Sequence, residues 1–159
     1  MKWYNGFSPE DRGRMVGETR RKSANGELPP LSGPCALCGE EEGKFQYHSE
    51  DYTEPWSWDP PATYVTCKSC HSRLHKRFDD PMGWEAFKAH IRRGGTSTEL
   101  QDPTHRTEVL VVREAVRKGQ PVPDLQVLRH RETPSDIWWE HLSPDPHQLP
   151  AWMEAPKPS

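Results

Sequence analysis

The amino-acid sequence predicts a small α+β fold whose core is stapled by a bound zinc ion. Only 32% of the 159 residues are hydrophobic, 28% are charged, and 17 are prolines. A core this thin usually needs a metal or disulfides to be stable. The four cysteines form two Cys-x-x-Cys pairs, which is ligand spacing typical of zinc. Short strand-like segments near these pairs, followed by helical patterns, complete the α+β prediction.

The chain begins with an expected helix that is basic in its second half. Ser8 is a hydroxyl N-cap and Pro9 stands at the first helical position, with acids just after it. We expect this helix to run to about Lys22. A proline-rich linker then leads to the first cysteine pair, so residues 1–34 are interpreted as an N-terminal extension.

Two strands and a helix are expected around the cysteine pairs. Residues 44–48 alternate like a short strand that ends on His48. Residues 63–66 are β-branched or aromatic, which is typical of a second strand. Residues 67–78 then carry Cys70 and later apolar residues at every fourth position, which predicts a helix directly after the second strand.

Further helical segments are expected after this unit. Residues 81–93 and 104–118 show helical patterns of apolar residues with glycine beyond their ends, and residues 134–142 predict a short amphipathic turn of helix. Five prolines follow residue 143, which indicates a tail without a packed core. The predicted division is residues 1–34, a zinc-bound domain over 35–95, a helical extension over 96–142, and a tail over 143–159.

Cys35, Cys38, Cys67 and Cys70 are the predicted ligands of a structural zinc ion. The first residues carry no apolar signal segment, so we expect a cytoplasmic protein, where thiols stay reduced. Disulfides or a redox dithiol are the alternatives, and the absence of a βαβ pattern argues against the second. A four-thiolate site has no open coordination position, so its expected function is folding rather than catalysis.

Three segments, CALCG, FQYHSEDY and TYVTCKSCHSRLHKRF, resemble the HNH (ββα-metal) endonuclease superfamily. The resemblance covers about residues 35–78 and is to the zinc-containing branch with two CxxC pairs. It implies a ββα-metal core that cleaves DNA. His48 matches the general base, which takes a proton from the water that attacks a phosphodiester. His71 matches a ligand of the catalytic divalent ion, Mg²⁺ or another.

The resemblance includes departures from the family pattern. Tyr47 stands where the family usually has a metal-binding aspartate or histidine, and the usual asparagine at the head of the second strand is missing. Glu50 or Asp51 is a possible replacement ligand. His75, one helical turn after His71, is another. The alternative function is therefore a catalytically degenerate HNH fold that serves as a zinc-binding module for nucleic acid or protein.

The charge pattern predicts a DNA-binding surface. Residues 35–66 carry seven acidic residues and one basic residue, whereas residues 67–94 carry seven basic residues and three acidic ones. Contacts to phosphates would give affinity and salt dependence rather than sequence choice. Ordinary solvated helix surfaces are the alternative explanation of these charges. The predicted phosphate contacts are Arg73, Lys76, Arg77, Arg92 and Arg93.

Tryptophans suggest further contacts. Trp56 and Trp58 either stack on bases or cover a small core. Trp138, Trp139 and Trp152 are possible anchors for a protein partner or a second copy of the chain, bound through the C-terminal helices. No stretch approaches the roughly 20 apolar residues of a membrane span, so we expect no membrane partner.

Overall fold

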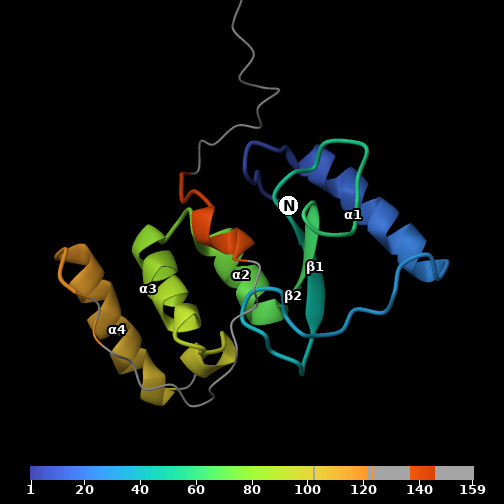
Figure 1. Cartoon of the computed structure of the whole chain (residues 1–159). Helices are drawn as coiled ribbons and strands as arrows, with labels where there is room; N and C mark the ends of the chain where they lie inside the picture. Colours follow the sequence, from blue (N-terminus) through green and yellow to red (C-terminus); the bar gives the residue numbers. More distant parts are fainter. Residues whose placement is uncertain (102, 122, 124–136, 146–159) are drawn as a thin grey trace, which may run out of the picture.

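A computed structural model describes residues 1–101, 103–121, 123 and 137–145 of the chain. Within these residues the fold is α+β, with four α-helices and one two-stranded sheet, as the sequence predicts (Figure 1). Figure 1 shows α1 on one side of the β-hairpin and α2, α3 and α4 on the other. None of the described helices combines the length and the apolar character needed to cross a bilayer.

Helix α1 spans Pro9–Ala24 and begins where the sequence predicts. Ser8 and Asp11 form a capping box, in which the Ser8 hydroxyl accepts the Asp11 N–H at 3.1 Å. Before the helix, Tyr4 and Phe7 pair across a tight turn. Both aromatic rings are buried with Met15 in a small second core, so α1 is fixed to the rest of the fold through its first turns.

The hairpin consists of β1 (Phe45–Ser49) and β2 (Thr63–Cys67), paired antiparallel. Helix α2 (Lys68–Lys76) follows β2 without a linker, and its N-cap is the last residue of the strand. The predicted strands are confirmed to within a residue or two, and the helix ends before residue 78. His48 pairs with Tyr64, so a histidine of β1 lies on the hairpin next to α2.

Helix α3 (Pro81–Arg92) packs against α2 and also against α4 (Pro103–Arg117). A 3₁₀ helix, η1 (Thr98–Gln101), lies between α3 and α4 in the sequence and was not predicted. A second one, η2 (Trp138–His141), falls within the predicted segment 134–142, whose first residues lie outside the described part.

The main core joins η2 and the helices α2 and α3 to the cysteines. Trp139 of η2 is fully buried in the same cluster as the four cysteine side chains, so it is not exposed as an anchor for a partner. Trp152 lies outside the described residues. Trp56 and Trp58 are half-buried against the second core, as the core-covering alternative predicts. The other apolar members of the main core are Leu37, Phe45, Leu74, Trp84, Phe87, Ile91 and Leu100.

Candidate metal centres

The four cysteines converge at the junction of β2 and α2. Cys35 and Cys38 stand on a tight turn before β1, Cys67 ends β2, and Cys70 lies in the first turn of α2. All four are buried, carry no disulfide, and place their Sγ atoms within 4.8 Å of one another. The Cys38 and Cys67 sulfurs are 3.9 Å apart. Sulfurs bound tetrahedrally at a Zn–S distance of about 2.3 Å lie about 3.8 Å apart, so the cluster fits a structural metal such as zinc.

Backbone groups shape the first cysteine turn for thiolates. Gly39 has a φ of 73°, which favours glycine, and its N–H donates to the Cys35 carbonyl at 2.9 Å. The N–H of Cys67 donates to the Cys35 sulfur at 3.2 Å. Hydrogen bonds from Cys38, and then from the other two cysteines, lower the pKa of Cys35. The turn therefore stabilises a charged sulfur even before an ion binds.

A second cluster consists of three histidines that come from two elements. His48 lies on β1, and His71 and His75 lie one turn apart on α2. One ring nitrogen from each lies within 4.8 Å of the others. The His71 and His75 rings stack with centroids 4.6 Å apart, and the His48 ring meets His71 edge-on at 5.3 Å. The structure thus brings together the two predicted catalytic histidines and His75, one of the possible replacement ligands.

The free nitrogens of this cluster have the properties of metal ligands. Nδ1 of His48 and Nδ1 of His71 are buried and have no hydrogen-bond partner. Burial first, and then the charge of His48, lowers the pKa of His71 to about 4. Burial followed by the charge of His71 lowers the pKa of His75 to about 3. Both rings are therefore neutral at pH 7 and keep a lone pair for an ion.

A buried network fixes the orientation of His48. Its Nε2 lies 2.5 Å from Oε1 of Glu50, and Oε2 of Glu50 accepts from Arg77 at 2.7 Å. The Tyr4 hydroxyl donates to Glu50 at 2.7 Å and accepts from Arg77 at 2.6 Å. Burial acts to raise the pKa of Glu50, but the hydrogen bond and charge of His48, with Arg77 and Tyr4, outweigh it and hold this pKa at about 2. Glu50 is therefore an ionised carboxylate that engages Nε2 of His48, while Nδ1 has no hydrogen-bond partner.

Aromatic rings from both ends of the fold cover the histidines. The Tyr4 ring lies 4.2 Å from the His75 ring, and the Trp138 ring lies 5.9 Å from the His48 ring. Trp138 is held by stacking on Tyr64 at 4.0 Å. Sequence reasoning missed these contacts. For Tyr4 a signal was present, because an Asn-Gly pair between two aromatic residues is typical of a tight turn.

Two residues near His48 do not join the cluster. Asp51 is exposed, and its Oδ1 accepts the Thr53 N–H at 2.8 Å, so it caps its own loop. Tyr47 precedes His48 on β1, and side chains alternate between the faces of a strand. Its hydroxyl donates to the carbonyl of Pro29 at 3.4 Å, away from the histidines. Tyr47 therefore neither supplies a ligand nor blocks the cluster.

The predicted phosphate contacts divide into two groups. Arg73 and Lys76 line an open cavity beside α2. Arg77 is 1% exposed and bonded to Glu50, so the structure places it inside the fold rather than on the surface that the prediction requires. Arg92 is exposed but forms an ion pair with Glu140. Arg93 is half-buried at the end of α3.

Comparisons with models of known protein families, with curated proteins and with solved structures found no match for this chain. The interpretation of the two clusters therefore depends on their geometry and on the resemblance in the sequence.

Proposed function

We propose that this chain is an HNH-type (ββα-metal), divalent-metal-dependent DNA endonuclease with a structural zinc ion. The observation that supports the proposal is the histidine cluster. Two imidazole nitrogens there, of His48 and His71, are buried without a partner, and an unpaired buried polar atom costs about 1–3 kcal/mol unless function or a ligand explains it. The cluster also lies on the same hairpin and helix as two of the four cysteines, Cys67 and Cys70.

In this proposal, zinc at the cysteines fixes the catalytic geometry. Cys67 and Cys70 bracket the β2–α2 junction, and His71 follows Cys70 directly. Holding that junction against the turn of Cys35 and Cys38 sets His71 opposite His48. A reducing cytoplasm is the compartment in which four unpaired cysteines persist as zinc ligands, and we propose it as the location of the protein.

His71 and His75 would hold the catalytic ion, which is Mg²⁺ or another divalent metal. Such an ion, when bound, offsets negative charge on a phosphodiester and stabilises the leaving oxygen. Imidazole nitrogens suit Ni²⁺ or Zn²⁺ better than Mg²⁺, which prefers oxygen ligands. Within the described residues the cluster contains no carboxylate, so we expect activity with a transition metal to exceed activity with Mg²⁺.

His48 is the proposed general base. In this proposal, Oε1 of Glu50 accepts a hydrogen bond from the protonated Nε2 of His48 at 2.5 Å. Nδ1 then carries the lone pair that removes a proton from water. This is the arrangement in which a carboxylate sets the tautomer of a catalytic histidine. Arg77 and Tyr4 hold Glu50 in turn, so the base is oriented by a network of four side chains.

One observation favours the alternative, a degenerate HNH fold that binds nucleic acid or protein without cleaving it. His48 is only 1% exposed, and Tyr4 and Trp138 lie over the cluster. A water and a phosphate need access to the same space. The two functions therefore differ in whether the covering rings leave the site open to DNA.

Nicking of supercoiled plasmid separates the two functions. We expect wild-type protein to nick DNA with Mn²⁺, Ni²⁺ or Mg²⁺. His48→Ala should lower the rate by about 10²–10⁴-fold, which is the usual contribution of a general base. His141→Ala is the matched control, because this histidine is exposed and belongs to η2. No nicking with any of these ions, or full activity in His48→Ala, would reject the enzyme.

A further inference from the structure

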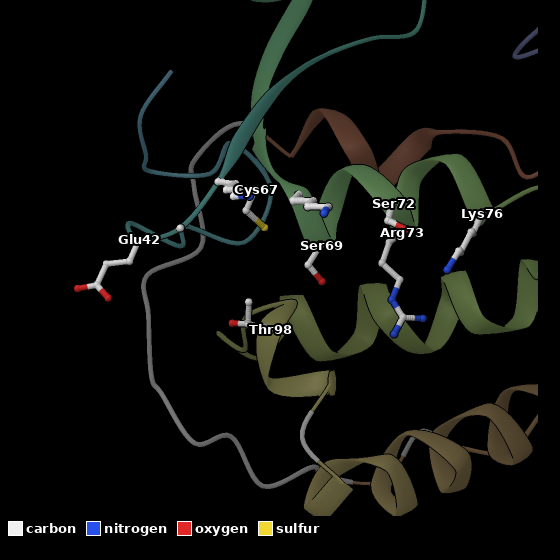
Figure 2. Close-up of a pocket in the computed structure, with 10 residues that line it drawn as sticks. Glu42, Cys67, Ser69, Ser72, Arg73, Lys76 and Thr98 are labelled. Atoms are coloured by element: carbon white, nitrogen blue, oxygen red, sulfur yellow. The ribbon is translucent and has the colours of Figure 1, made fainter. Parts of the chain in front are cut away.

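A basic cavity of about 590 Å³ lies on the flank of α2 next to the flank that carries the histidines. Four cations line it: Lys44 from the start of β1, and Lys68, Arg73 and Lys76 from α2. Figure 2 shows Arg73 and Lys76 extending from the same side of α2 as Ser69, toward the segment that carries Thr98. The cavity thus collects positive charge from the base of the hairpin and the whole length of the helix.

Positive side chains outnumber carboxylates in the lining of this cavity. Among the described residues, none of the four lining cations forms an ion pair. Glu42 is the one carboxylate in the lining, and Figure 2 shows its side chain directed outward. The first turn of α2 contains no acidic residue. A lining with an excess of cations attracts an anion.

The spacing of the cations suits a polymer better than a single phosphate. Lys68 and Lys76 are eight residues apart on α2, which corresponds to about 12 Å at the rise of an α-helix. Phosphates of one DNA strand rise about 3.4 Å each along the duplex axis, so this row matches three or four of them. Ser72, exposed between the two lysines, adds a hydroxyl donor of the kind that contacts phosphate oxygens.

We propose that this groove binds the phosphodiester backbone of a DNA strand and guides it to the histidines. Lys68, Ser72 and Lys76 form one row of α2, and His71 and His75 form the neighbouring row. A strand that follows the first row passes the second within about the 10 Å diameter of a helix. The inference rests on the proposed function for the identity of the polymer as DNA. Of the predicted contacts it keeps Arg73 and Lys76; Lys44 and Lys68 take the place of Arg77, Arg92 and Arg93.

Fluorescence anisotropy of a labelled 20-base-pair duplex, titrated with NaCl and without added divalent ion, tests this proposal. Four contacts predict a slope of about −3.6 for the logarithm of the binding constant against that of the salt concentration. Lys68→Ala and Lys76→Ala should each reduce the slope by about 0.9 and weaken binding about eightfold at 0.1 M salt. Lys68→Arg should keep both values near those of the wild type. Arg20→Ala, which removes an exposed cation of α1, should change neither.

An increase in affinity for the duplex is the most informative result, because a misfolded variant would not bind more tightly. Glu42→Gln removes the carboxylate of the lining and should tighten binding about twofold or more, with the slope retained. Wild-type slopes in both lysine variants, or equal binding of the duplex and of heparin at equal charge, would overturn the proposal. The assay is independent of cleavage: His71→Ala should bind normally even where it fails to nick, and a nuclease that ignores Lys68 and Lys76 would retain the proposed function without this groove.

Discussion

Replacing Arg77 by alanine is the perturbation for which the structure gives the most definite expectation. The guanidinium is 1% exposed and joins three distant parts of the chain. It donates to Glu50 at 2.7 Å, to the Tyr4 hydroxyl at 2.6 Å and to the carbonyl of Ser143 at 2.9 Å. Alanine at this position removes all three bonds and leaves the Glu50 carboxylate without its cation.

The expected loss of stability follows from these contacts. Removing one partner of a buried ion pair costs about 3–5 kcal/mol, because the other charge stays buried and unpaired. Glu50 is partly exposed and keeps His48 and Tyr4, so we expect about 3 kcal/mol. With a urea m value of about 1.5 kcal/mol/M, the unfolding midpoint should fall by about 2 M. Urea denaturation of the zinc-loaded protein, followed by tryptophan fluorescence, measures this shift.

Controls separate the ion pair from a general effect of mutation. Lys76→Ala, at an exposed position of the same helix, should change stability by no more than about 0.5 kcal/mol. Arg77→Lys keeps the charge without the planar fork and should lose an intermediate amount. In a double-mutant cycle, Arg77→Met with Glu50→Gln should show a coupling above about 1 kcal/mol. A loss below about 1 kcal/mol in Arg77→Ala, with the protein folded, would refute this reasoning.

Three further predictions concern the core. Cys70→Ser, or a strong chelator, should abolish cooperative unfolding at 25 °C, since zinc binding of about 10–16 kcal/mol exceeds the usual stability of a domain; circular dichroism with metal analysis tests this. Gly95→Ala should destabilise by about 1–3 kcal/mol, because a Cβ there would lie 2.2 Å from Nε2 of His90, and a thermal melt with unchanged Tm would contradict it. Trp139→Ala should cost about 3–5 kcal/mol in urea denaturation, whereas exposed Ile137→Ala should be nearly neutral; equal effects would place Trp139 outside the core.

The elements that the sequence predicts well are those specified by neighbouring residues. A serine followed by proline and acids identifies the start of α1, since the capping box needs only residues three apart. The first strand of the hairpin is found from alternation, the second from its β-branched and aromatic residues, and the cysteine cluster from two local pairs. Each of these signals is complete within a short window, so no tertiary information is needed.

Burial of Arg77 shows a case in which residue type and helical phase conflict. Arginine is assigned to the surface by type, because it is rarely buried without a partner. Yet Arg77 lies seven residues after Cys70, two helical turns on, and therefore on the same inward face. For residue 77, position around the helix therefore predicts burial better than residue type does. The partner that makes burial tolerable is the Tyr4–Glu50 pair, and Tyr4 is 73 residues away in sequence, beyond any local pattern.

The position of Tyr47 illustrates how the fold connects ligand choice to metal preference. Alternation along β1 turns Tyr47 away from the cluster, so a carboxylate in its place would also face away. The second proposed ligand comes instead from His75, one turn along α2 from His71, whereas Glu50 contacts Nε2 of the proposed base, His48. Under the proposed function, the protein ligands of the ion are therefore all imidazoles. The carboxylate of Glu50 supports only the general base, His48. Such a donor set favours transition metals over Mg²⁺, so under that proposal the departure at Tyr47 affects the choice of ion.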